Sequence, residues 1–181
     1  MKNSSRLHAL LGLAACALGA SVANAGQNCR AVHALIIDKS APVNCASPYF
    51  FCAAGTVDGN LGLDGTTYFV LDGAVAPPAT APGFGVTSGL LVYTTRHGTL
   101  TVRETGVSKL TGQPSNGFLT SLQEVIGGTG RFAGASGTLY NRAVDVNSLF
   151  YSRISGKLCL QMQLDKGEHD SWNDWHDEDD E

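Results

Sequence analysis

The chain has 181 residues, a net charge of −4, 43% hydrophobic residues and 15% charged residues. This length is typical of one domain, and the hydrophobic content excludes a chain that is disordered throughout. The low charge and the 22 glycines argue against a coiled coil or helical bundle, and the negative net charge argues against general nucleic-acid binding.

The N-terminus has the pattern of an export signal. Lys2 and Arg6 precede the apolar run from Leu10 to Val22, which is followed by Ala23-Asn24-Ala25. A positive start, a short apolar run and a small-x-small motif predict a signal peptide over residues 1–25, cleaved before Gly26. The apolar run is too short for a typical membrane-spanning helix.

Two alternatives remain for this segment. Leu13-Ala14-Ala15-Cys16 resembles a bacterial lipobox, which would make Cys16 the lipidated residue of an anchored lipoprotein. The segment could also form a buried N-terminal helix. The favoured prediction is an exported protein of the periplasm or the extracellular space.

Export makes the remaining cysteines candidates for disulfides. Cys29, Cys45, Cys52 and Cys159 form an even set, as expected in an oxidising compartment. Spacing favours Cys29–Cys45 across a proline loop, which leaves Cys52–Cys159 to join the first strong strand to the last. A zinc site is the weaker alternative, because the chain has no C-x-x-C motif.

The stretch between residues 31 and 164 has the pattern of consecutive β-strands. Short β-branched and aromatic runs alternate with turn residues, as at Asp64-Gly65 and His97-Gly98, and apolar residues alternate strictly from Thr99 to Arg103. The predicted strands are Ala31–Ile37, Tyr49–Val57, Thr66–Leu71, Gly89–Arg96, Thr99–Arg103, Phe118–Ile126, Ser136–Arg142 and Asn147–Met162, the last being one bent strand or two.

No stretch has a useful helical stripe, so the predicted fold class is all-β. Seven or eight strands with short turns predict antiparallel pairing, in a barrel or a sandwich. A single closed barrel of about eight strands is favoured, because closure removes exposed edges. Such a barrel over residues 26–164 has room for a small apolar ligand, or is filled by its own side chains.

A glycine-rich segment lies between two of the predicted strands. Its spacing is not that of a dinucleotide-binding motif, and the residues after it are β-rich rather than helical. We interpret it as a tight connection in which Gly127, Gly128 and Gly130 permit positive φ. Phe132 would then pack into the barrel end, and Gly137 would let the next strand bend.

The segment from Gly128 through Phe132 to Gly137-Thr138-Leu139 resembles the glycine–phenylalanine motif of the allene oxide cyclase and dirigent superfamily. The resemblance extends over about residues 49–162 and is strongest to exported bacterial members of unassigned role. It implies an eight-stranded antiparallel barrel, often trimeric in the plant branches. It also implies handling of small hydrophobic molecules without a metal or organic cofactor, by steering a cyclisation or coupling. No catalytic residue of either branch matches a position of this chain.

Chemistry alone suggests few catalytic candidates. A confined cyclisation needs an acid or a base, and burial can shift the pKa of either. Glu124 and Glu104 lie in predicted strands, and Tyr68, Tyr93 and Tyr140 could donate a hydrogen bond. For each of the five, a packed or outward-facing position is the favoured interpretation. No Ser/His/Asp triad is supported.

The C-terminal segment, residues 165–181, concentrates the negative charge. It carries nine acidic residues and one lysine, together with both tryptophans, Trp172 and Trp175. Such a segment is usually a solvated tail. The tryptophans also allow a segment that docks on the barrel or on a partner, or weak metal binding by histidine and aspartate, although no EF-hand loop fits.

The favoured function is an exported barrel that binds a small hydrophobic ligand and steers a cofactor-free cyclisation or isomerisation. The alternative is a non-enzymatic envelope or extracellular protein that binds or assembles through its barrel surface and acidic tail. A homo-oligomer is compatible with both. A hydrolase is disfavoured because no nucleophile and base could be identified.

Overall fold

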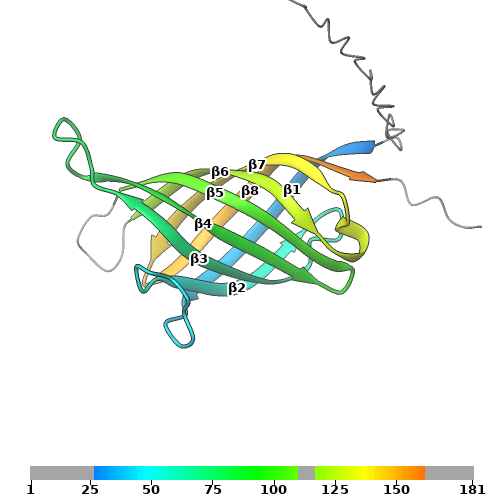
Figure 1. Cartoon of the computed structure of the whole chain (residues 1–181), viewed down its shortest axis with the longest axis horizontal. Coiled ribbons are helices and arrows are strands. Elements are labelled where there is room, and N and C mark those ends of the chain that lie inside the picture. The colour runs from blue at the N-terminus through cyan, green and yellow to red at the C-terminus, as the bar shows by residue number, and fades with distance from the viewer. Residues whose placement is uncertain (1–26, 110–116, 162–181) are drawn as a thin grey trace, which may run out of the picture.

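The computed structural model describes residues 27–109 and 117–161, which form one closed antiparallel barrel (Figure 1). Each strand pairs with the next along the chain, and the last pairs with the first. The strands are β1 (Gln27–Ser40), β2 (Cys52–Gly59), β3 (Gly65–Val75), β4 (Phe84–Thr95), β5 (Gly98–Lys109), β6 (Phe118–Gly128), β7 (Ser136–Val146) and β8 (Leu149–Gln161). The predicted all-β class and eight-stranded barrel are confirmed.

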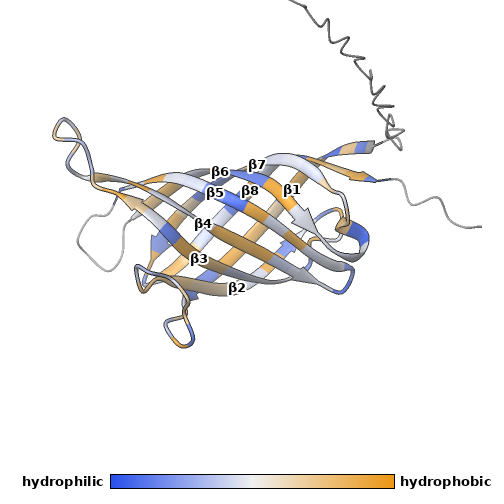
Figure 2. Cartoon of the chain, in the orientation of Figure 1, coloured by the Kyte–Doolittle hydropathy of each residue, from blue (hydrophilic) through white to orange (hydrophobic). Residues whose placement is uncertain are grey.

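Side-chain alternation explains why the strands close. Hydrophobic and hydrophilic bands succeed one another along them (Figure 2), and in β1 Val32, Ala34 and Ile36 are buried while the residues between them are exposed. Successive side chains of a strand point to opposite faces of the sheet. Closing the sheet therefore removes one face of every strand from water.

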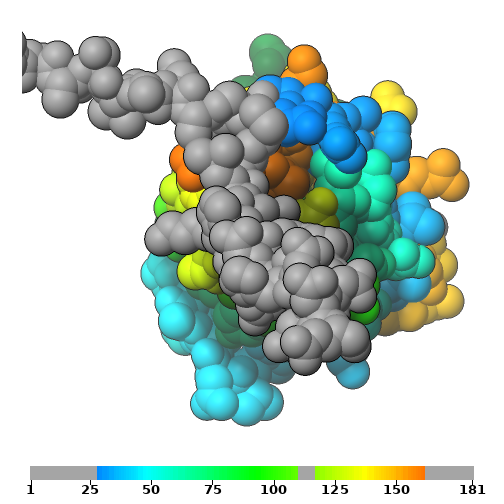
Figure 3. Space-filling view, turned by 90° about the vertical axis from the view of Figure 1, so that its right-hand side faces the viewer, coloured from blue at the N-terminus to red at the C-terminus, as the bar shows by residue number. Residues whose placement is uncertain are grey.

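The barrel closes where β1 meets β8. Their pairing runs from Gln27 opposite Gln161 to Lys39 opposite Leu149. Figure 3, viewed from the end where β1 begins and β8 ends, shows residues of the two strands against one another. This ladder pairs the two strand edges at which the sheet would otherwise be open.

One end of the barrel is filled by an apolar plug. Here the short 3-10 helix η1 (Gly130–Phe132) packs against β5, and Phe132 is fully buried. The core around it comprises Val32, Ala34, Ile36, Val57, Leu63, Leu91, Tyr93, Leu100, Val102, Ala135, Leu139, Ile154 and Leu158. Side chains therefore fill this end of the lumen.

The glycine-rich connection differs in detail from its prediction. Gly130 has a φ of +57° and Gly137 a φ of +149°, but Gly127 and Gly128 belong to β6 and are not among the glycines with positive φ. A Cβ on Gly128 would lie 2.4 Å from the carbonyl oxygen of Phe132. Gly128 is therefore needed for the close approach of η1 rather than for a turn.

The predicted cysteine pairing is wrong. The disulfides are Cys29–Cys159 and Cys45–Cys52, not Cys29–Cys45 and Cys52–Cys159. Strand β1 already begins at Gln27, so Cys29 lies near its start and directly opposite Cys159 of β8. Cys45 follows the other end of β1, too far away along the strand to reach Cys29. Two disulfides are typical of a non-reducing environment, as in exported proteins.

Residues 1–26 and 162–181 lie outside the described residues. They hold the predicted signal peptide, the lipobox alternative at Cys16 and the acidic tail with Trp172 and Trp175. Within residues 27–109 and 117–161, no helix has the length and hydropathy needed to cross a membrane.

The two disulfides should contribute unequally to stability. Cys29–Cys159 closes a loop of 130 residues and Cys45–Cys52 one of seven, so loop-closure entropy predicts about 5 and about 2.5 kcal/mol respectively. Urea unfolding should therefore show that C29A/C159A lowers the free energy of unfolding more than C45A/C52A does. Non-reducing peptide mapping should recover the same two pairs, and a Cys52–Cys159 peptide would contradict this assignment.

Candidate functional site

The other end of the barrel holds a cavity of about 370 Å³. It lies between the apolar plug and the end where β1 leaves the barrel, and all eight strands and the residue just before β2 contribute to its walls. The lining residues are Ile36, Asp38, Phe51, Ala53, Phe69, Leu71, Thr87, Ser88, Leu91, Glu104, Ser108, Lys109, Gly117, Phe118, Leu119, Asn141, Ala143, Asp145, Phe150 and Ser152. This volume is in the range of small-molecule sites.

Aromatic side chains line the outer part of the cavity. The ring of Phe51 lies 6.4 Å from that of Phe69 and 6.1 Å from that of Phe150, both in edge-to-face geometry. Such pairs stabilise one another beyond the area they bury. Cys52 immediately follows Phe51, and its disulfide with Cys45 restrains the loop that carries the Phe51 ring.

The inner end of the cavity is polar and is centred on Glu104. Leu100, Val102 and Glu104 alternate along β5, so Glu104 faces inward and is only 6% exposed. Its carboxylate accepts three hydrogen bonds from β6 and β7. The donors are Ser121 Oγ at 2.6 Å, Gln123 Nε2 at 2.8 Å and Asn141 Nδ2 at 3.3 Å.

The network continues toward the plug through Tyr93. The Tyr93 hydroxyl donates to Gln123 Oε1 at 2.8 Å, and neither side chain is exposed. Burial, followed by the negative charge of Glu104, holds the pKa of the Tyr93 phenol well above its usual range. Tyr93 therefore stays protonated and acts as a hydrogen-bond donor that orients Gln123.

A second carboxyl, Asp38, lies inside the barrel at the end of β1. Its Oδ1 accepts a hydrogen bond from Thr67 Oγ1 of β3. Gly55 lies directly opposite it on β2, and a Cβ there would lie 2.4 Å from Asp38 Oδ1. Glycine at position 55 therefore leaves room for the Asp38 carboxyl.

Burial raises the pKa of Asp38 to about 6, because the charged carboxylate loses its hydration. The hydrogen bond from Thr67 lowers the pKa and the negative charge of Glu104 raises it, both to a smaller extent. Asp38 can therefore exchange a proton close to neutral pH, which is the property that a general acid or base requires.

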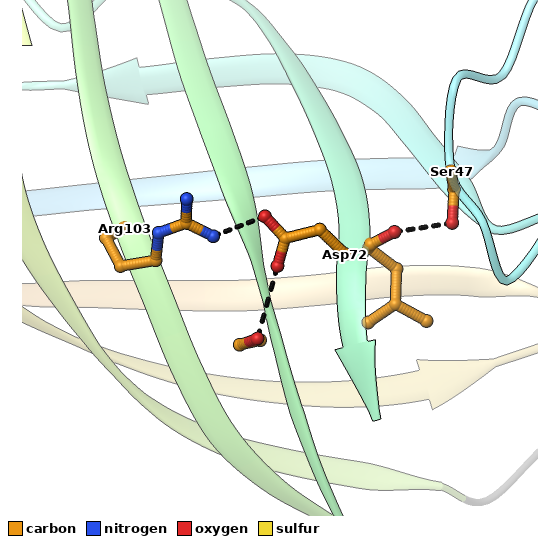
Figure 4. Close-up of polar contacts among 5 residues, drawn as sticks. Ser47, Asp72 and Arg103 are labelled. Atoms are coloured by element: carbon orange, nitrogen blue, oxygen red, sulfur yellow. Dashed lines mark hydrogen bonds and ion pairs between the residues drawn. The ribbon is translucent and has the colours of Figure 1, made fainter. Parts of the chain in front are cut away.

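The barrel's outer face holds an ion pair that does not reach these carboxyls. Arg103, adjacent to Glu104 in β5, points outward and pairs with Asp72 of β3, which also accepts a hydrogen bond from Ser88 (Figure 4). The hydrogen bond from Arg103 lowers the pKa of Asp72. Among the described residues this is the one ion pair, so no basic side chain forms a salt bridge with Asp38 or Glu104.

The five catalytic candidates from the sequence divide between the two faces. Glu104 and Tyr93 lie inside and belong to one hydrogen-bonded network, whereas Glu124, Tyr68 and Tyr140 are exposed on the outside. The sequence reasoning missed other inward polar residues. These are Asp38, Thr67, Ser121, Gln123, Asn141 and Ser152.

The arrangement combines an apolar chamber with fixed polar groups at its inner end. It can enclose an apolar molecule, position a polar part of it against carboxyl and amide groups, and exchange a proton at Asp38. Over residues 27–109 and 117–161, no group of three or more His, Cys, Asp or Glu side chains is placed to hold a metal ion.

Comparison of the chain with protein-family models, with curated proteins and with solved structures gave no match. Function must therefore be argued from the chamber itself.

The raised pKa of Asp38 predicts a pH-dependent cost to stability. The folded state binds the Asp38 proton more tightly than the unfolded state. Asp38 therefore does not lower the free energy of unfolding below about pH 4, and lowers it by the full amount above about pH 6. A shift from 3.8 to about 6 corresponds to about 3 kcal/mol.

D38N should therefore be more stable than the wild type at pH 8, by about 2 to 3 kcal/mol, and should lose that advantage at pH 4. Urea unfolding at both pH values measures the difference. Equal stability differences at the two pH values would show that Asp38 titrates normally in the folded protein.

Proposed function

We propose that this protein is an exported β-barrel that binds a small hydrophobic ligand in the chamber between Glu104 and the Phe51–Phe69–Phe150 rings. The single observation that carries the proposal is the half-filled lumen: one end is plugged, while the other keeps about 370 Å³ of mainly apolar space. A protein that needed its barrel only as a scaffold would gain stability by filling that space.

The buried polar groups also support a ligand site. Glu104 and Asp38 carry a desolvation cost that apolar residues would avoid, and such groups concentrate at functional sites. Asn141 Oδ1 is buried and has no hydrogen-bond partner in the described part of the chain. Unsatisfied buried acceptors are rare in folded proteins, and a bound molecule would satisfy this one.

We further propose that the chamber steers a cofactor-free cyclisation or isomerisation, as the resemblance to the allene oxide cyclase and dirigent superfamily implies. The apolar walls would hold a reactive molecule in one shape and exclude water. Asp38 would supply or accept the proton, and Glu104, held in place by three donors, would stabilise developing positive charge.

Ligand binding is tested by filling the chamber. Ala143 of β7 is 5% exposed and lines the cavity, whereas its neighbour Val144 is 50% exposed on the outer face. A143F should abolish the fluorescence enhancement of an apolar dye such as Nile red, or weaken its binding at least about tenfold. V144F is the matched control and should bind the dye as the wild type does.

Circular dichroism and thermal unfolding should first show that both variants fold. A53F, which fills the chamber from β2, provides a second test should A143F fail to fold. Wild-type binding that A143F and A53F leave unchanged would place the dye outside the chamber and overturn the proposal.

A second candidate function, binding or assembly through the barrel surface, is favoured by one feature of the outer wall. Ile37, Tyr151, Val144 and Phe118 are direct cross-strand neighbours over β1, β8, β7 and β6, and each is at least 41% exposed. A contiguous exposed apolar row is typical of an interaction surface.

A charge in the middle of this row should weaken any self-association through it. V144K should shift the sedimentation coefficient of an oligomeric wild type toward that of a monomer, because a buried unpaired lysine opposes assembly. S155K, at an exposed position of β8 outside the row, is the control. A wild type that is monomeric at all concentrations would show that the protein does not self-associate through this row.

A further inference from the structure

The inner end of the chamber presents hydrogen-bond acceptors rather than donors. Asn141 is 5% exposed and lines the cavity, and its Nδ2 donates to Glu104 Oε1. This bond fixes the orientation of the amide, because the reverse orientation would place its oxygen against a carboxylate oxygen. The acceptor Oδ1 is therefore the atom that has no partner among residues 27–109 and 117–161, and it needs a donor from outside them.

Most inward donors of this region already hydrogen-bond within the protein, Ser152 being the exception among the described residues. Ser121, Gln123 and Asn141 all donate to Glu104, Thr67 donates to Asp38, and the Tyr93 hydroxyl donates to Gln123. A ligand group that only accepts hydrogen bonds would therefore find few donors at the inner end of the chamber.

The same end carries two carboxyls without a cation. Asp38 and Glu104 both line the cavity, and each lacks a salt bridge within the described part of the chain. Arg103 is paired with Asp72 on the outer face. Lys109 lines the cavity at the far end of β5, where its Nζ lies 5.8 Å from the centre of the Phe84 ring.

We propose that the ligand of this chamber is a hydrophobic amine, an inference that rests on the ligand-binding function proposed above. Its protonated nitrogen would lie at Asn141 Oδ1, Glu104 and Asp38. Its apolar body would pack against the phenylalanine rings. An alkylammonium group offers three donors and no acceptor, like a lysine side chain. The ammonium group would donate a hydrogen bond to Asn141 Oδ1 and would also neutralise carboxyl charge in a largely apolar space.

The alternatives match the site less well. A carboxylate head would face two carboxyls and an amide oxygen, and one hydroxyl, that of Ser152, does not offset that repulsion. A hydroxyl could donate to one acceptor, but it would leave the carboxyl charges uncompensated.

The test compares three probes that share one apolar chain and differ only in the head: decylamine, decanol and decanoate. Each is titrated by calorimetry against the full-length protein slightly above neutral pH and below its micelle concentration. We expect decylamine to bind at least about tenfold more tightly than decanol, and decanoate to bind most weakly.

Variants locate the head group. D38N removes one carboxyl charge and N141L removes the amide acceptor. Each should weaken decylamine binding by about tenfold or more and should change decanol binding by much less. D58N removes a carboxyl from the outer face of β2 and is the charge-matched control, which should leave decylamine binding unchanged.

A143F separates chamber binding from attraction of the amine to acidic residues elsewhere, because it closes the chamber and leaves the charge of the chain unchanged. Decylamine binding that survives A143F would overturn the inference. Equal affinity for the three heads, or tighter decanoate, would overturn it while leaving the hydrophobic chamber in place. Failure of all three probes to bind would overturn the proposed function as well.

Discussion

The pairing of β1 with β8 is the constraint on which the rest of the structure depends. It runs nearly the whole length of both strands, and the Cys29–Cys159 disulfide links them at one end. Without it the inner faces of all eight strands would belong to an open sheet with two exposed edges. With it, the inner faces enclose a lumen in which a carboxyl such as Glu104 can be held away from water.

Inside that lumen the side chains follow a consistent order along the strands. In β5 the inward residues pass from Leu100 and Val102 in the plug to Glu104, and in β7 from Leu139 to Asn141 and then Ala143. A polar layer thus separates a packed core from the chamber. Such a layer costs stability, and its hydrogen bonds hold the side chains in fixed positions. This combination of cost and order supports the ligand site proposed above rather than a purely structural core.

Much of the fold could be predicted from the sequence because period-two alternation and turn residues are local. Asp38 could have been placed inside by the same rule, since it continues the inward series of Val32, Ala34 and Ile36. The contacts of Asn141 with Glu104 could not, because they depend on the register of strands that are far apart in the chain. The cysteine pairing failed for that reason: sequence spacing does not reveal that Cys29 lies opposite Cys159.

The plug around Phe132 also determines how a ligand would enter and leave the chamber. Because that end is filled, the chamber is a blind pocket, and a molecule must leave through the opening by which it came. A polar group bound at Glu104 would travel inward first and lose its hydration while still passing the phenylalanine rings. Entry and exit through the same opening would make both rates depend on the same phenylalanine side chains.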